Sequence, residues 1–195
     1  MTIDVILIVL GSVLTIVAII PYLIEVISKK TKPRIVSWLV WTIITSIAAI
    51  AALVDRQYPT AILLFSAALE TLAVVLLGWK NSDKTIEKID VVCFAGAAIG
   101  IILWQVLDSP AIAVIATVVA DFIGGIPTLL HSWKKPQEET WITFFISFMG
   151  AVCTLLVISD WRITSFAYPF FLVVINLVFT SVIILRKHKL AKQLL

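Results

Sequence analysis

Apolar residues fill seven long runs of this chain, and short polar segments separate the runs. We predict a helix over each: Ile3–Ile27, Ile35–Val54, Thr60–Trp79, Ile89–Leu107, Ala111–Trp133, Trp141–Ile158 and Thr164–Leu185. An α-helix of about 20 apolar residues crosses roughly 30 Å of hydrocarbon. The pattern therefore predicts an all-α polytopic membrane protein with seven transmembrane helices, surrounded by a lipid bilayer.

The composition supports the same class. Of 195 residues, 61% are hydrophobic and 14% are charged, and the mean hydropathy is +1.10. A soluble domain of this length needs far more charge on its surface. The net charge of +3 follows from the loops that flank the runs, and we expect no nucleic-acid partner.

The distribution of lysine and arginine predicts the orientation. Thirteen of the fifteen follow the first, third, fifth and seventh runs: Lys29, Lys30, Lys32, Arg34, Lys80, Lys84, Lys88, Lys134, Lys135, Arg186, Lys187, Lys189 and Lys192. Arg56 and Arg162 are the other two. Cytoplasmic loops carry the excess of basic residues. We therefore expect an integral protein of the plasma (inner) membrane with its N-terminus outside and its C-terminus in the cytoplasm.

The chain contains an internal repeat. A shift of 106 residues places Pro21 on Pro127 and "PYLIEVISKK" on "PTLLHSWKKP", so runs one to three align with runs five to seven. We predict two parallel three-helix repeats, 1–80 and 111–195 with its basic tail, joined by a linker helix (3+1+3). The linker segment is 81–110, with its span at 89–107.

Small residues in the linker span permit a close helix contact. Gly96 and Gly100 stand four residues apart in "GAAIG", a spacing typical of tightly packed membrane helices. The sequence leaves open whether they contact the same bundle or a second copy in a homo-oligomer. Cys93 and Cys153 lie in apolar runs and read as small packing residues. We expect no cofactor and no metal.

Two carboxylates lie near the middle of predicted spans. Glu70 is about ten residues into the third span and Asp121 about ten into the fifth, where a charge costs on the order of 3 kcal/mol. No lysine or arginine lies inside a span, so each acid is either protonated or open to a water-filled cavity. The shift of 106 relates Glu70 to Asn176 and Thr15 to Asp121. We predict that these four residues line a pathway for a small-molecule or ion substrate.

The same repeat relates the predicted breaks in the helices. Pro21 and Pro127 remove a backbone hydrogen bond at matching places in the first and fifth spans, and Gly124 and Gly125 precede Pro127. Irregular backbone at membrane depth is tolerated where it is buried or lines a cavity. We interpret these four residues as hinges.

Aromatic residues lie close to the inner ends of the first two spans. Tyr22 follows Pro21, and Trp38 and Trp41 stand one helical turn apart. Such residues serve as interfacial anchors or, alternatively, as an inner gate. His131 titrates near neutral pH and is a further candidate for this gate.

The segment "IIPYLIEVISKKTKPRIVSWLVW" and its second copy "GGIPTLLHSWKKPQEETW" resemble the PQ-loop superfamily, which includes the SWEET sugar transporters. Tyr22 and Thr128 stand where that family has a glutamine after the motif proline. The resemblance implies the 3+1+3 fold, hinges at the two prolines, and substrate contacts at Glu70 and Asn176, where SWEET transporters have asparagines.

Three functions are compatible with these features. The first is a transporter of a small polar or cationic solute that works by alternating access, with Asp121 either binding a proton or steadying the broken helix. The second is a proton or cation channel lined by the intramembrane acids, and the third is a membrane receptor without transport. An enzyme is not expected, because the sequence shows no nucleophile with a base, metal cluster or phosphate loop.

Overall fold

Each apolar run of the sequence folds as an α-helix in the computed structural model, which describes residues 3–54, 58–86, 88–106, 110–158 and 161–193. Backbone amides and carbonyls in an apolar medium must bond to each other, and a helix achieves this within one segment. The described residues contain no β-strand. The helices are α1 (Ile3–Ile27), α2 (Ile35–Val54), α3 (Tyr58–Gly78), α4 (Lys88–Val106), α5 (Pro110–Lys134), α6 (Trp141–Leu156) and α7 (Ile163–Gln193), with a 3-10 turn η1 (Pro136–Glu138) before α6.

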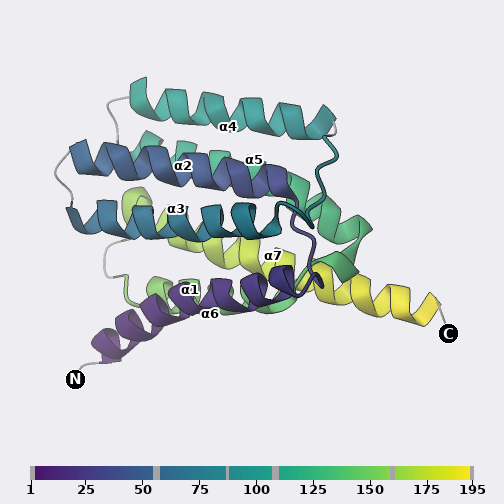
Figure 1. Ribbon diagram of the computed structural model, residues 1–195. Coiled ribbons are helices and arrows are strands. Elements are labelled where there is room, and N and C mark those ends of the chain that lie inside the picture. The colour runs from purple at the N-terminus through teal and green to yellow at the C-terminus, as the bar shows by residue number, and fades with distance from the viewer. Residues whose placement is uncertain (1–2, 55–57, 87, 107–109, 159–160, 194–195) are drawn as a thin grey trace.

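The predicted runs agree with these helices in number and order. The bounds of α1 and α2 are the predicted ones, and α3 to α6 differ from prediction by two residues or fewer at each end. The largest difference is in α7, which continues past the predicted end at Leu185 to Gln193. The basic tail is therefore a continuation of the last helix (Figure 1).

Three of the described helices are long and apolar enough to cross a membrane: Ile3–Ile27, Val114–Lys134 and Phe166–Gln193. Shorter apolar helical segments lie at Ile35–Ser46, Ala67–Gly78 and Trp141–Leu156. Large apolar side chains such as Ile3, Leu69 and Leu76 are at least 65% exposed, as expected of a surface that faces lipid. The chain is thus all-helical with apolar helices of membrane-spanning length, while the number of spans stays a prediction.

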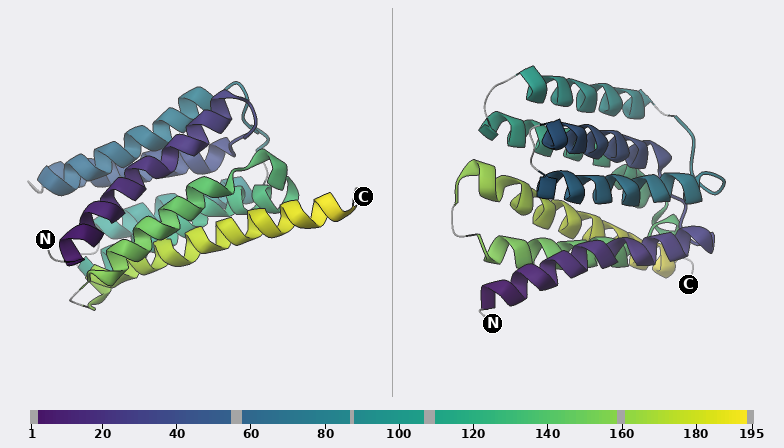
Figure 2. Two further views of the ribbon diagram at one scale, coloured as in Figure 1. Left: turned by 90° about the horizontal axis from the view of Figure 1, so that it is seen from below. Right: turned by 60° about the vertical axis from the view of Figure 1, so that its left-hand side comes forward.

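The helices pack side by side with their axes roughly along one direction (Figures 1 and 2). Helix α1 contacts α3 and α6, α2 contacts α3 and α5, and α7 contacts α5 and α6. Helix α4 lies at the edge of the bundle against α5 and α2. A Cβ added to Gly96 would lie 3.2 Å from Ile123, so Gly96 packs α4 against α5 of the same chain. The side-chain surroundings of Gly100 lie outside the described residues.

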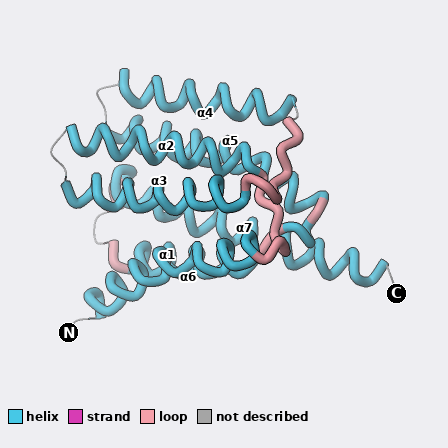
Figure 3. Tube along the Cα trace, in the orientation of Figure 1, coloured by secondary structure: helices cyan, strands magenta, loops and turns pink. Residues whose placement is uncertain are grey.

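Most of the described loops gather at one end of the bundle, opposite the start of α1 (Figure 3). This basic end, as we call it, comprises residues 28–34, 79–86 and 135–140, which connect α1 to α2, α3 to α4 and α5 to α6. After α1, Lys29 adopts a left-handed φ of 60°. The chain then turns so that the Thr31 hydroxyl donates to the Glu25 carboxylate at 2.7 Å.

Two apolar clusters support the basic end. The first joins α1, α2 and α3 and contains Tyr22, Val26, Ile35, Trp38, Val74 and Val75. The second joins α6 and α7 and contains Phe144, Phe179 and Ile183. Close packing of these side chains joins the helices next to the loops, since van der Waals packing is a main contribution to helix association in lipid.

Candidate functional site

Arg34 is the centre of an ion-pair network at the basic end. It immediately precedes α2 and its side chain is 5% exposed. Its guanidinium bonds Asp90, at the start of α4, and lies 3.2 Å from Asp83 in the loop before that helix. The fork of donors in an arginine suits two carboxylates. Arg34 therefore ties the start of α2 to both ends of the α3–α4 connection.

Asp83 accepts bonds from several sides. The Thr85 amide donates to it at 3.0 Å, and Lys135 Nζ at 3.3 Å. Partial burial alone favours the neutral acid, but the Thr85 and Lys135 hydrogen bonds and the Arg34 charge outweigh that cost and hold the pKa of Asp83 at about 2. Asp83 is therefore an anion that joins the α3–α4 loop to the end of α5.

His131 lies between two carboxylates in the same network. Its Nδ1 is 3.5 Å from Asp83, and its Nε2 is 3.3 Å from Glu138. Glu138 also accepts a bond of 2.8 Å from Lys32 Nζ, and the Lys32 amide donates to the Glu138 carbonyl at 2.7 Å. The α1–α2 loop is thus fastened to the α5–α6 loop by both backbone and side-chain bonds.

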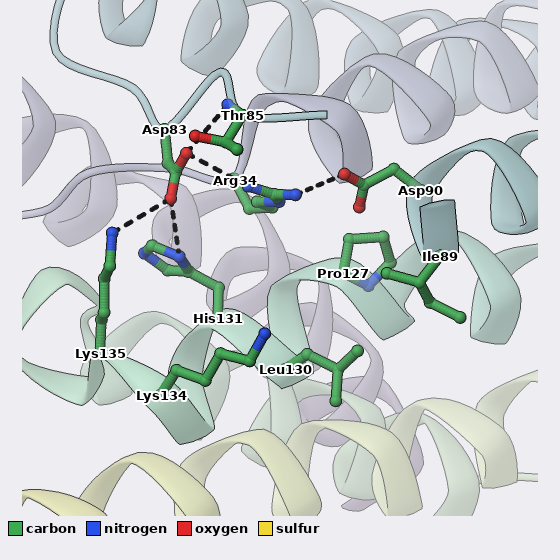
Figure 4. A pocket seen from close by; sticks show the side chains of 10 residues that line it. All are labelled: Arg34, Asp83, Thr85, Ile89, Asp90, Pro127, Leu130, His131, Lys134 and Lys135. Carbon is green, nitrogen blue, oxygen red and sulfur yellow. Dashed lines mark hydrogen bonds and ion pairs between the residues drawn. The ribbon is translucent and has the colours of Figure 1, made fainter. Parts of the chain in front are cut away.

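A cavity of about 210 Å³ opens beside this network. Figure 4 shows Asp83 bonded to Thr85, Arg34, His131 and Lys135 at its rim. Pro127 and Leu130 of α5 form its apolar wall together with Ile89 of α4. The cavity holds charges of both signs, and its acids are already paired with basic residues.

A second polar contact crosses the bundle a short distance away. The Tyr22 hydroxyl donates to Glu139 Oε2 at 3.0 Å and accepts a bond of 3.1 Å from Trp38 Nε1. Both Tyr22 and Glu139 are completely buried. Burial, followed by the nearby negative charges of Glu138 and Glu25, raises the pKa of Glu139 to about 8, although the Tyr22 hydrogen bond and Lys187 oppose the rise.

The predicted gate residues Tyr22, Trp38 and Trp41 belong to one aromatic group. The ring centres of Tyr22 and Trp38 are 4.7 Å apart, and those of Trp38 and Trp41 are 5.2 Å apart. Tyr22 also meets Phe144 of α6 edge to face at 6.5 Å. His131, the fourth candidate, lies in the ion-pair network instead.

The predicted hinge residues lie within continuous helices. Pro21 is inside α1 and Pro127 inside α5. Directly after Pro127, the Thr128 amide donates at 3.2 Å to the Ser37 hydroxyl of α2. A side chain of another helix thus accepts a hydrogen bond from the backbone next to the proline. A Cβ on Gly124 would lie 2.7 Å from Val40, whereas one on Gly125 would be 3.5 Å from Trp41. The lack of a side chain at Gly124 therefore permits close packing against α2, in addition to the predicted hinge role.

The midplane candidates have mostly local partners. Asp121 accepts a bond of 2.9 Å from the Tyr168 hydroxyl of α7. Thr15 donates to the Gly11 carbonyl and Asn176 to the Leu172 carbonyl, both within their own helices. Glu70 is half-buried, and among the described residues no hydrogen bond or ion pair reaches its carboxylate. Thr15 packs beside Gly150 of α6.

Sequence reasoning missed Glu139, Arg34 and Tyr168. The acid stands in "KKPQEETW", where a solvated loop is the natural interpretation. Arg34 contributed only to the count of basic residues. Tyr168 offered a usable signal, since a hydroxyl beside Pro169 in an apolar run needs a partner. Within the described residues, no group of three or more His, Cys, Asp or Glu is placed to hold a metal ion.

Comparisons with protein-family models, curated proteins and solved structures gave no match to this chain.

Proposed function

We propose that this protein is a membrane transporter that moves a small polar or cationic solute by alternating access of two three-helix bundles. In this proposal it has seven spans in a 3+1+3 arrangement, with the N-terminus outside. The observation that carries the proposal is the double fastening of α1 and the loop that follows it to the α5–α6 loop. Lys32 bonds Glu138 and Tyr22 bonds Glu139, which is what a closed inner gate between two moving halves requires.

The helix neighbours support a two-fold relation between the halves. A shift of 106 residues turns the α1–α6 contact into α5–α2, α2–α3 into α6–α7, and α1–α3 into α5–α7, and all six contacts are present. Lys32 and Glu138 differ by 106 positions and bond each other. Two equivalent residues can touch only near a shared axis, so this pair supports an axis through the basic end.

The residue roles follow from this arrangement. Glu70 and Asn176 would contact the solute, with Asp121 as a proton site and Thr15 beside the pathway. Pro21 and Pro127, with Gly124 and Gly125, would allow the inner halves of α1 and α5 to move. Support for a movable α5 comes from the Thr128 amide, whose bond to Ser37 is one that a small displacement of α2 breaks. The resemblance to the PQ-loop superfamily agrees with these roles.

The first experiment measures proton flux into proteoliposomes under an imposed potential, with no solute added. Wild type is compared with Glu70→Gln and Asp121→Asn. If the protein is a carrier, proteoliposomes show no proton leak without solute. A screen of polar and cationic solutes should then find saturable flux. A steady leak that either substitution abolishes makes this a channel, and solute binding without flux makes it a receptor.

A second experiment tests movement at the gate itself. In a Cys93→Ser/Cys153→Ser background, Lys32→Cys and Glu138→Cys are introduced together, because their backbones are bonded at 2.7 Å and thus close enough for a disulfide. We expect oxidation to stop saturable flux and reduction to restore it. Each single-cysteine variant is the matched control. Undiminished flux in the cross-linked protein would contradict alternating access.

A further inference from the structure

Glu139 stands out among the acids of this protein by its position. It lies between η1 and α6, and its side chain is completely buried although it belongs to a loop. Its Oε2 receives one hydrogen bond, from Tyr22 of α1, while its Oε1 is buried and has no hydrogen-bond partner in the described part of the chain. An ionised carboxylate at this depth needs two or three donors. The environment therefore suits the neutral acid.

The charges around Glu139 lead to the same conclusion. Glu25 faces it from α1, Glu138 precedes it in the loop, and Lys187 faces it from α7. The ammonium of Lys187 donates to the backbone carbonyl of Glu139 at 2.7 Å, not to its carboxylate. Lys187 also interacts with Glu25. Lys187 is thus shared by Glu25 and Glu139, and Glu138 is paired with Lys32, so a proton on Glu139 leaves the charges of the group balanced.

The apolar side of the site excludes water. Trp38 covers Tyr22 from α2, and Phe144 of α6 meets the same ring at 6.5 Å. The hydroxyls of Thr140 and Thr143, at the start of α6, are buried and find no hydrogen-bond partner in the residues described. Separation of α1 from the α5–α6 loop would bring solvent to the carboxyl.

We propose that Glu139 is a proton-binding site of the inner gate, which takes up one proton when the gate closes and releases it to water on the basic side when the gate opens. This inference rests on the proposed alternating access. On opening, the carboxyl O–H bond breaks, the proton passes to water, and the carboxylate becomes hydrated. On closing, the proton returns and Tyr22 donates again to the neutral acid.

The direction of the pH effect follows from two pKa values. Burial holds the pKa of Glu139 at about 8 in the closed state, against an ordinary value of 4.5, which a water-exposed carboxyl approaches in the open state. A proton therefore binds the closed state more tightly. Closure is fully favoured below pH 4.5, and its advantage falls by about tenfold per pH unit until pH 8.

The test measures the distance between the two loops as the pH changes. Lys30 and Gln137 are exposed and carry spin labels on introduced cysteines, in the Cys93→Ser/Cys153→Ser background. We expect the short-distance population to fall as the pH rises from 5.5 to 8.5. In Glu139→Gln, whose amide cannot ionise, the short distance should persist across the whole range.

Glu138→Gln is the matched control, because it is the neighbouring glutamate and forms ion pairs instead of a buried contact. The loop distance of this variant should still respond to pH, with the fall displaced to lower pH, because the Glu138 charge is one cause of the raised pKa of Glu139. Tyr22→Phe provides a second variant with a directional outcome. Loss of its hydroxyl removes a contact of the closed gate and also the one donor that favours the ionised form. The closed population should therefore be smaller at every pH, and its fall should come at higher pH than in the wild type.

Two outcomes would overturn the proposal: a loop distance in the wild type that does not respond to pH, or a Glu139→Gln variant that responds as the wild type does. Saturable flux measured on the same labelled protein separates this failure from failure of the proposed function. If saturable flux is observed but the loop distance does not respond to pH, only the proposed role of Glu139 is contradicted. If the loops never separate and no solute is transported, the proposed transporter function itself is contradicted.

Discussion

Asp83 and Glu139 lie at the same end of the bundle, yet their surroundings push them in opposite directions. Asp83 is held by Thr85, Lys135 and Arg34, and its pKa is about 2. Glu139 is buried against aromatic rings with a single donor, and its pKa is about 8. Burial favours the neutral acid at both sites. The difference shows that the depth of burial, together with the number of donors and cations, decides whether the charged or the neutral form of a carboxyl is favoured.

The two regions suit two different tasks. The network around Asp83 joins α2, α4 and the end of α5 through an acid whose pKa of about 2 keeps it charged at neutral pH, so the charge of Asp83 does not respond to pH changes near neutrality. The contact of Glu139 with Tyr22 joins α1 to the α5–α6 loop through a group that changes charge near neutral pH. Of the two, the contact of Glu139 is the one through which pH can control a gate, because it weakens as the carboxyl ionises.

Removal of the guanidinium should have the largest effect. Arg34→Met leaves Asp83 and Asp90 without their shared cation in a buried setting, and breaking a buried ion pair costs about 3 kcal/mol or more. We expect a marked fall in the midpoint of thermal unfolding in detergent. Lys30→Met, in the same loop but exposed, should unfold close to the wild type. Equal effects of the two substitutions would contradict the central role of Arg34.

The second-largest effect should be a loss of stability at alkaline pH, caused by ionisation of Glu139. Its raised pKa means that stability is fully present below pH 4.5 and declines as the pH rises to about 8. At about 1.4 kcal/mol per pKa unit, the wild type should lose roughly 3 kcal/mol between pH 5.5 and 8. Unfolding of Glu139→Gln should lack this decline toward pH 8. A variant as sensitive as the wild type would assign the loss to another group.

Asp83 should produce a smaller effect at the opposite end of the pH scale. Its lowered pKa contributes stability that is present above pH 3.8 and is lost as the pH falls through about 2. Asp83→Asn should cost about 1–2 kcal/mol at neutral pH, because its hydrogen bonds then lack a charged acceptor. Acid titration of unfolding should bring the two proteins together near pH 2. Curves that stay parallel would contradict an ionic Asp83.

The smallest effect is expected at the exposed pair on the proposed axis. Lys32 is about half exposed and Glu138 about one-fifth exposed, so Lys32→Ala should change stability by about 0.5 kcal/mol. High salt should weaken the wild type similarly and leave the variant unchanged. The pH response that depends on Glu139 should be unaffected. Loss of this response in Lys32→Ala would show that the Lys32–Glu138 pair and the Glu139 site act as one network.

Much of the fold could be predicted because it depends on runs of one kind of residue. Helices α1 and α2 have the bounds that the apolar pattern predicts, since the backbone of an apolar segment can satisfy its hydrogen bonds only as a helix. The end of α7 was predicted too early. Leu190 and the charged residues around it end the apolar run, but a helix needs no apolar surroundings and continues to Gln193.

The candidate site was predictable only where the residue itself was unusual. Asp121 attracted attention because an acid is rare in an apolar run, but its partner Tyr168 is 47 positions away. Tyr22, Trp38 and Trp41 were recognised as a possible gate, and they do form one aromatic group. Glu139 gave no signal, because nothing in "QEET" distinguishes the acid that is buried from the one before it.

By itself, the sequence determined the class of protein, the order of its helices and the segregation of basic residues to alternate loops. These properties follow from local hydropathy and charge, which each segment carries wherever it is placed. Only the tertiary structure decided that Glu138 forms ion pairs while the adjacent Glu139 is buried against Tyr22. That choice depends on the positions of Tyr22, Trp38 and Lys187, which three separate helices bring together.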